Sequence, residues 1–133
     1  MSSLAEATMN STGRPILVVD DDAAVRDVVL MTLALEGYRV IEAENGADAL
    51  SLIEEERPSL VVLDMQMPVL DGWGLVHELR ARHLDPPIIV MTAGKNAERA
   101  PHEIGADGFV GKPFELNDLL MQVERLRTRD RAA

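Results

Sequence analysis

Ile16-Leu17-Val18-Val19-Asp20-Asp21-Asp22 is the stretch that decides the fold, because four apolar residues run directly into three acids. An apolar run of this length is too short for a helix, and its polar end is typical of a buried strand in a parallel sheet. Two more runs repeat the pattern clearly, and two repeat it more weakly. The five predicted strands are Ile16–Asp20, Tyr38–Glu42, Leu60–Asp64, Ile88–Thr92 and Gly108–Lys112.

Between these runs, apolar residues recur at the spacing of one helix face. The segment Ala97–Ile104 is the weakest helical prediction, because Pro101 lies inside it. Strand and helix alternate, which predicts an α/β fold: a doubly wound five-stranded parallel sheet with right-handed crossovers. The other predicted helix faces are Val25, Val28, Val29 and Leu33; Ala49, Leu50 and Ile53; Leu75, Val76 and Leu79; and Leu116, Leu119, Leu120, Val123 and Leu126.

Length and composition exclude several classes of protein. A chain of 133 residues has room for one domain of this kind. The absence of cysteine excludes disulfides, thiolate metal sites and thiol nucleophiles. The formal net charge of −10 opposes binding to nucleic acid. Every apolar run is far shorter than the roughly 20 residues of a membrane span, so we expect no contact with a membrane.

The ends of the chain are predicted to lie outside the domain. Residues 1–13 contain neither the basic start nor the apolar stretch of a signal peptide, so we expect a flexible leader retained in a cytoplasmic protein. Residues 14–127 form the predicted domain, and residues 128–133 form a short Arg-rich tail. These arginines suit the electrostatics of a helix end.

The chemistry-bearing residues follow the strands. Functional groups of an open α/β sheet gather at the carboxyl ends of its strands, where the predicted strands carry Asp20 and Asp21, Asp64, Thr92 and Lys112. Clustered carboxylates repel one another, and oxygen-only ligands favour magnesium. A lysine and a hydroxyl suit phosphoryl oxygens. The pattern predicts a phosphoryl-accepting site in which Asp64 is the nucleophile.

Each of these residues also has a purely structural interpretation. Asp20–Asp22 can cap a helix and occupy its first turn, and Asp22 fits that role best. Asp64 can be a turn residue, Thr92 can start a helix, and Lys112 can lie at the surface. Their shared placement at one edge of the predicted sheet favours a functional site.

Five motifs occur in order along the chain: Ile16 to Asp22; Leu63-Asp64-Met65-Gln66-Met67-Pro68 followed by Asp71-Gly72; Met91-Thr92-Ala93; Gly105-Ala106-Asp107; and Lys112-Pro113-Phe114. Together they closely resemble a bacterial two-component response regulator receiver domain of the chemotaxis-regulator type. The resemblance covers residues 14 to 127. It implies a flavodoxin-like fold with strand order 2-1-3-4-5.

The resemblance also implies a role for each acid. Asp64 would be the phosphoacceptor. Asp20 and Asp21 would hold Mg²⁺, together with Asp64 and the main-chain carbonyl of Gln66.

Further residues are implied around the phosphoryl group. Thr92 and Lys112 would contact it, and the bond between Lys112 and Pro113 would be cis, which only X–Pro bonds adopt at low cost. Phe109 stands at an aromatic switch position where many relatives have Tyr. We expect Thr92 to move toward the phosphoryl group and Phe109 to fill the space it leaves; the alternative is that Phe109 is permanent core. The face from the fourth predicted strand to the last helix would then bind an unknown downstream protein.

One departure concerns assembly. Relatives that dimerise through the last strand often carry two acids before the aromatic, whereas here Asp107 is followed by Gly108. Together with the net charge of −10, this favours a monomer when unphosphorylated.

The leading functional hypothesis is a single-domain response regulator of a phosphorelay. It would receive a phosphoryl group from a histidine kinase or histidine phosphotransfer protein and would act by binding another protein. It would not be an enzyme with a separate substrate, although it would assist its own phosphorylation and dephosphorylation. The alternatives are a receiver domain of a hybrid kinase or multidomain regulator, an aspartate-nucleophile phosphohydrolase and a flavodoxin-like cofactor binder. Gln66, where such hydrolases commonly have a second acid, opposes the phosphohydrolase. The acids after the first strand oppose the cofactor binder, because they would repel a cofactor phosphate.

Overall fold

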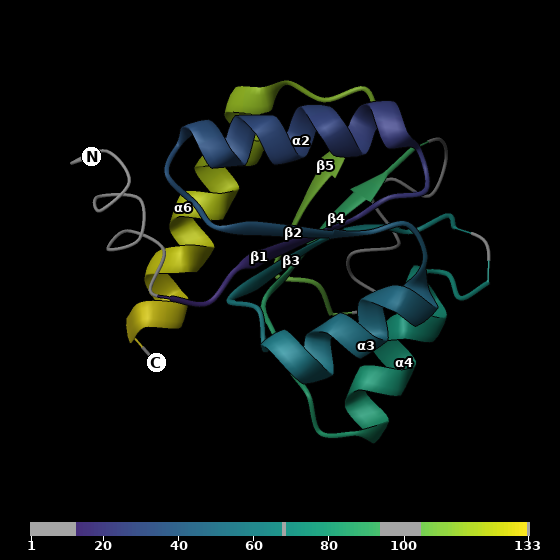
Figure 1. The fold of residues 1–133 in the computed structure, drawn as a ribbon. Helices are drawn as coiled ribbons and strands as arrows, with labels where there is room; N and C mark the ends of the chain where they lie inside the picture. Colours follow the sequence, from purple (N-terminus) through teal and green to yellow (C-terminus); the bar gives the residue numbers. More distant parts are fainter. Residues whose placement is uncertain (1–12, 68, 94–104, 133) are drawn as a thin grey trace.

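A five-stranded parallel sheet forms the centre of the computed structural model, which describes residues 13–67, 69–93 and 105–132, with side chains up to Leu126 in the last helix. The strands lie in the order β2-β1-β3-β4-β5 (Figure 1), which confirms the predicted fold class and strand order. Their bounds are β1 Ile16–Val19, β2 Val40–Ala43, β3 Leu60–Asp64, β4 Ile88–Thr92 and β5 Gly108–Gly111.

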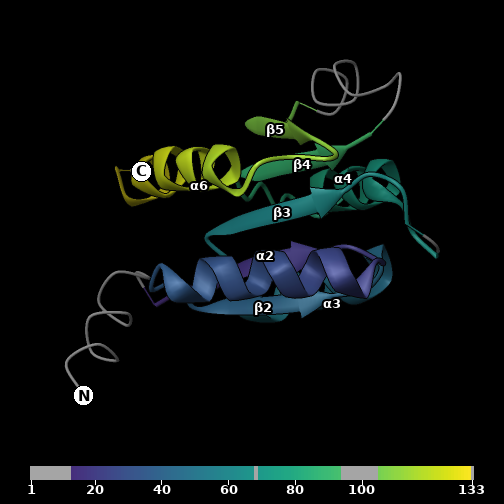
Figure 2. The same cartoon turned by 90° about the horizontal axis from the view of Figure 1, so that it is seen from above.

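Helices cover both faces of this sheet, with α2 and α6 on one face and α3 and α4 on the other (Figures 1 and 2). The predicted helix at Ala97–Ile104 lies outside the described residues. No helix in the described part of the chain is both long and apolar enough to cross a membrane. The helices are α2 Ala23–Leu35, α3 Gly46–Glu56, α4 Gly72–Ala81 and α6 Leu116–Ala132.

The two layers of helices explain why β1 is apolar at every position. Leu17 and Val19 of β1 pack in the core under α3 and α4, whereas Ile16 and Val18 pack in the core under α2 and α6. Successive side chains of a strand point to opposite faces, and here both faces are covered. All four residues of β1 are therefore buried.

The start of β2 differs from the prediction, which began the second strand at Tyr38. The N–H of Tyr38 still donates to the carbonyl of Leu33, and the N–H of Gly37 donates to the carbonyl of Ala34. These two bonds, with Gly37 at a φ of 93°, form a Schellman ending of α2. The strand therefore begins at Val40, because Tyr38 still completes the helix.

Three helices begin with a polar cap that directly follows a strand or its loop. The side chain of Asp22 accepts from the N–H of Ala24 at 2.9 Å, which gives it the capping role that the sequence suggested. Asn45 caps α3, and Asp71 caps α4, in the same way. These caps satisfy N–H groups that a helix leaves open at its start.

The loop after Asp64 is held in place by the start of α3. The N–H of Gly46 donates to the carbonyl of Leu70 at 3.0 Å. A Cβ atom at Gly46 would overlap that carbonyl oxygen, so the close approach requires glycine. The contact therefore fixes the loop that runs from Asp64, the last residue of β3, to the start of α4.

We predict that Gly46→Ala lowers the free energy of unfolding by about 2–3 kcal/mol, because the added methyl group pushes the loop away. Helix propensity alone predicts the opposite sign, since alanine is the better helix former. Gly111→Ala is the matched control, because an added Cβ there would meet only the Thr92 carbonyl oxygen, at 4.0 Å. Urea unfolding measures the stability of both variants. Equal unfolding midpoints for Gly46→Ala and Gly111→Ala would contradict the proposed clash with the loop.

Candidate functional site

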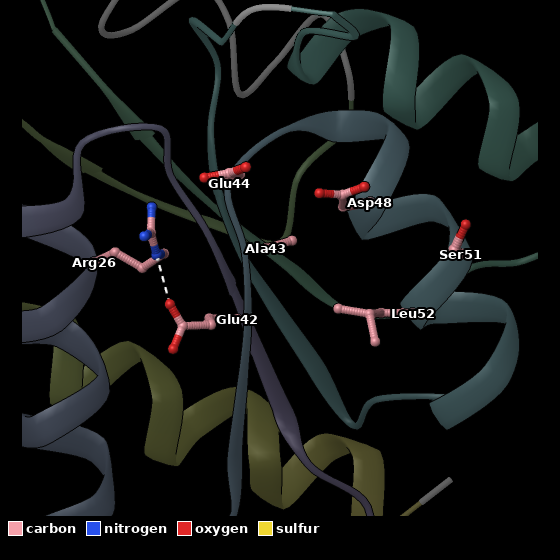
Figure 3. A pocket seen from close by; sticks show the side chains of 7 residues that line it. All are labelled: Arg26, Glu42, Ala43, Glu44, Asp48, Ser51 and Leu52. Atoms are coloured by element: carbon pink, nitrogen blue, oxygen red, sulfur yellow. Dashed lines mark hydrogen bonds and ion pairs between the residues drawn. The ribbon is translucent and has the colours of Figure 1, made fainter.

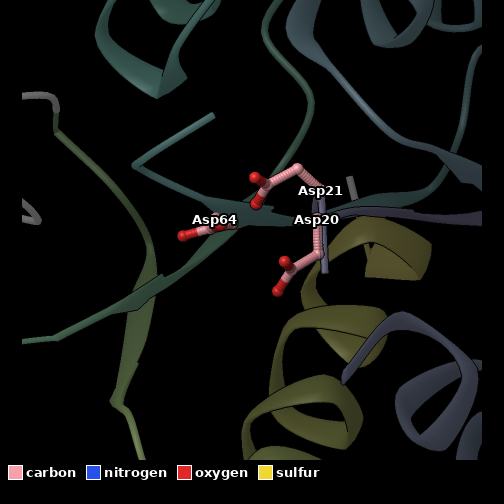
Figure 4. A group of neighbouring side chains, drawn as sticks. All are labelled: Asp20, Asp21 and Asp64. Atoms are coloured by element: carbon pink, nitrogen blue, oxygen red, sulfur yellow. The ribbon is translucent and has the colours of Figure 1, made fainter. Parts of the chain in front are cut away.

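Three carboxylates meet at the carboxyl edge of the sheet (Figure 4). β1 and β3 are neighbours with Val19 opposite Leu63, so Asp20, which follows β1, comes beside Asp64, the last residue of β3. One carboxylate oxygen from each of Asp20, Asp21 and Asp64 lies within 4.8 Å of the others. The structure thus brings together the three acids that the sequence singled out.

Asp20 is the most constrained of these acids, with no exposed surface. Its N–H donates to the carbonyl of Ala43 at 3.2 Å, and its own carbonyl accepts from Arg26 Nη1 at 2.6 Å. Oδ1 accepts from the N–H of Asp22 at 2.9 Å, and Oδ2 accepts from Lys112 Nζ at 2.9 Å. Every polar atom of Asp20 therefore has a protein partner, which fixes both its main chain and its carboxylate.

Lys112 supplies positive charge to the cluster. Its Nζ lies 2.9 Å from Asp20 Oδ2 and 3.6 Å from Asp64 Oδ1. Its N–H donates to the carbonyl of Thr92 at 2.6 Å, which holds its main chain against β4. The bond between Lys112 and Pro113 is cis. Burial lowers the pKa of the Lys112 ammonium, but the hydrogen bond to Asp20 and the charge of Asp64 outweigh burial and raise the pKa overall. Lys112 is therefore charged and partly neutralises the acids.

Asp64 is buried, and its pKa is raised to about 6. Burial is the main cause, followed by the negative charge of Asp20; the N–H of Gln66, which donates to Asp64 Oδ1 at 3.2 Å, and the charge of Lys112 act in the opposite direction. The side chain of Gln66 is exposed, so only its main chain lies against Asp64. Ionised Asp64 is therefore short of positive charge, which suits an incoming cation or electrophile.

The raised pKa predicts that ionised Asp64 destabilises the fold. Between about pH 4, near the pKa expected in the unfolded chain, and about pH 6, the folded chain holds the Asp64 proton more tightly than the unfolded chain does. The free energy of unfolding therefore falls as the pH rises through this range. In metal-free buffer, we expect Asp64→Asn to be more stable than the wild type by about 3 kcal/mol at neutral pH. This difference should disappear as the pH falls to about 4.

Urea unfolding across this pH range, with a chelator present, measures the difference. Asp85→Asn, at an exposed position, is the control for loss of a negative charge. A constant difference between wild type and Asp64→Asn at every pH would rule out this explanation.

Thr92 and Phe109 lie on neighbouring strands and on the same side of the sheet. Thr92 pairs with Gly111, and Val90 pairs with Phe109, so the two side chains are two positions apart on one face. Thr92 is 5% exposed, whereas Phe109 is 42% exposed. The interpretation of Phe109 as permanent core is therefore wrong, because its ring is accessible in this structure.

Arg26 is a site residue that the sequence reasoning missed. It extends from the first turn of α2 and donates to the carbonyl of Asp20, while its Nε lies 2.8 Å from Glu42 Oε1 (Figure 3). The ion pair lines a groove of about 430 Å³ beside β2 and α3. Helix side chains lean toward the N-terminus, so a long donor four residues after the Asp22 cap was a usable signal.

Comparison with known proteins identifies the class of this protein. The sequence model of the response regulator receiver domain matches residues 16–124. The chain therefore belongs to the response regulator receiver domain family, as the resemblance indicated.

Relatives and solved structures agree with this assignment. The chain is 45% identical over 123 residues to the probable transcriptional regulator ycf27 of Porphyra purpurea, covering 91% of this chain and 50% of that protein. It is 46% identical over 116 residues to the response regulator MprA of Mycolicibacterium vanbaalenii, covering 86% and 50%. The receiver domain of the Francisella response regulator 1452 superposes with a TM-score of 0.81 at 29% identity, covering 87% of this chain and 98% of that one. The chain thus spans about half the length of the curated relatives it matches.

Proposed function

We propose that this receiver domain accepts a phosphoryl group on Asp64 from the phosphohistidine of a histidine kinase or histidine phosphotransfer protein. The observation that carries the proposal is the environment of Asp64: a buried carboxylate at the end of β3, with two further acids and the Lys112 ammonium around it. A structural turn residue would need neither the neighbouring acids nor a lysine that reaches it from β5.

In the proposed step, a carboxylate oxygen of Asp64 attacks phosphorus and forms the P–O bond of an acyl phosphate. The P–N bond to the donor imidazole breaks, and the imidazole nitrogen keeps the electron pair and takes up a proton from solvent. In this proposal, Lys112 and the Thr92 hydroxyl contact the oxygens of the transferred group. Thr92 ends β4, which lies next to β3, and Lys112 follows β5, which lies next to β4.

The acidic cluster fits a magnesium ion. Its donors are all oxygens, Asp21 is exposed, and burial together with the negative charge of Asp20 raises the pKa of Asp64 to about 6. The groups that would hold Mg²⁺ are the carboxylates of Asp20, Asp21 and Asp64 and the main-chain carbonyl of Gln66. When bound, the ion supplies positive charge that offsets the charge of the transferring phosphoryl group.

The proposed output is phosphorylation-dependent binding of another protein, through the face formed by β4, β5 and α6. In this proposal Thr92 moves toward the phosphoryl group, and Phe109 turns inward from its exposed position. The accessible ring supports the proposal, because a ring already in the core could not repack in this way. An aspartate-nucleophile phosphohydrolase is disfavoured, because the exposed Gln66 side chain stands where such an enzyme commonly has a second acid.

A second candidate places the same chemistry in a longer regulator. The matched relatives ycf27 and MprA are about twice as long as the region they share with this chain, which favours a receiver domain that acts together with a further domain. Single-domain action and action on an attached domain differ in the output. They do not differ in the phosphoacceptor.

The phosphoacceptor is tested with acetyl phosphate and MgCl₂, followed by intact mass and peptide mapping. We expect one phosphoryl group on Asp64, lost at alkaline pH as an acyl phosphate. We expect none in Asp64→Asn, none without Mg²⁺, and slower modification in Asp21→Asn. A phosphoryl group that persists in Asp64→Asn would refute the assignment.

The coupling is tested with Thr92→Ala, which should still accept the phosphoryl group on Asp64. It should lose the phosphorylation-dependent change in amide exchange at β5 around Phe109, because the hydroxyl that draws the strand inward is missing. Burial of a phenyl ring contributes roughly 2 kcal/mol, which corresponds to about a thirtyfold change in a two-state equilibrium. Thr32→Ala on α2 is the matched control. If phosphorylated Thr92→Ala showed the same change in amide exchange around Phe109 as the wild type, the proposed coupling between Thr92 and Phe109 would be wrong.

A further inference from the structure

The Arg26 guanidinium links three separate elements at the acidic edge. It comes from α2, donates from Nη1 to the Asp20 carbonyl at the end of β1 at 2.6 Å, and pairs through Nε with Glu42 of β2 at 2.8 Å. Neither contact reaches the acidic cluster itself, since both acceptors lie outside the three carboxylates.

The Asp20 carbonyl is a significant acceptor because of the peptide to which it belongs. That carbonyl and the N–H of Asp21 are parts of one planar unit. A donor that fixes the carbonyl therefore fixes the plane that connects two of the three acids. Asp20 has further restraints on its carboxylate, but the carboxylate of Asp21 is exposed and depends on the main chain for its direction.

The exposure of Glu42 indicates that the ion pair orients Arg26 more than it stabilises the fold. The Arg26 side chain is 13% exposed and the Glu42 side chain 52%, so water screens the charge of Glu42 and the pair adds little to folding stability. A guanidinium can serve two acceptors in fixed directions at once. An ammonium is a point charge, and it cannot reproduce this fork.

We propose that Arg26 is a positioning residue for the divalent-cation site, with Glu42 orienting its guanidinium. This inference rests on the proposed function, because it assigns Arg26 to the cation that Asp20, Asp21 and Asp64 would hold. Arg26 acts through the Asp20–Asp21 peptide and touches neither the cation nor the phosphoryl group.

The test is a titration of the full chain with MgCl₂ alone, followed by Trp73 fluorescence and independently by calorimetry. Loss of a residue that orients metal ligands typically weakens affinity by at least about tenfold. We expect Arg26→Lys and Glu42→Ala each to weaken Mg²⁺ binding on the order of tenfold. Glu42→Gln keeps an acceptor for Nε, and its affinity should stay within about twofold of wild type.

A second readout separates positioning from a general loss of structure. At saturating Mg²⁺, the initial rate of modification by acetyl phosphate should be close to wild type in Arg26→Lys, because the acids are restored once the cation is held. Arg82→Lys is the matched control. Arg82 forms ion pairs with Glu54 and, at 3.5 Å, with Glu78, on the side of the molecule formed by α3 and α4. It should leave Mg²⁺ affinity unchanged.

The outcomes are distinct. Wild-type Mg²⁺ affinity in Arg26→Lys or in Glu42→Ala overturns the inference and leaves the proposed function standing. If Arg26→Lys does not fold, Glu42→Ala decides, since its half-exposed carboxylate can be removed without opening the core. If Arg82→Lys weakens Mg²⁺ binding as much as Arg26→Lys does, the inference is also overturned. A wild-type chain that neither binds Mg²⁺ nor accepts a phosphoryl group overturns both proposals.

Discussion

Crowding of negative charge at the carboxyl edge of the sheet is the constraint on which the rest of the structure depends. Oxygens of Asp20, Asp21 and Asp64 lie within 4.8 Å of one another. Two full charges at that distance repel by about 3 kcal/mol at an effective dielectric constant of 20. The sheet tolerates this repulsion because β1 and β3 lie at its centre, where apolar packing on both faces holds the two strand ends together.

The three acids respond to this crowding in different ways. Asp20 is buried and held at every polar atom, so it serves as a fixed negative charge. Asp21 is exposed, so its carboxylate is accessible from solvent. Asp64 has the raised pKa, since it is buried next to Asp20 and receives weaker compensation from Lys112. One cluster thus contains a fixed carboxylate, an exposed carboxylate and a buried carboxylate with a raised pKa, and the proposed function uses all three.

The loops at this edge are set by contacts that also shape the helices. Gly46 at the start of α3 holds the loop after β3 through the Leu70 carbonyl, and Asp22 caps α2 directly after the acids. Helix starts and site residues therefore share the same few positions. A substitution that disturbs a cap at this edge is therefore expected to disturb the site.

Local pattern alone determined much of the fold, because buried strands and amphipathic helices each require a characteristic spacing of apolar residues. The unbroken apolar run Ile16–Val19 predicts a buried strand, and the structure shows why: helices cover both faces of the sheet at this strand. The exact start of β2 was beyond local pattern, since Tyr38 is as suitable for a strand as Val40, and only the hydrogen bond from Tyr38 to Leu33 assigns it to the end of α2.

The sequence by itself determined which chemical groups stand at the carboxyl ends of the strands, and parallel pairing makes such ends meet. The neighbour relations among the strands came only from the family resemblance, and the structure confirmed them. Tertiary structure alone decided that Arg26 reaches the Asp20 carbonyl, that the pKa of Asp64 is about 6, and that Phe109 is 42% exposed. Each of these depends on distances between side chains from different elements. A one-dimensional pattern fixes the faces of an element, but it leaves those distances open.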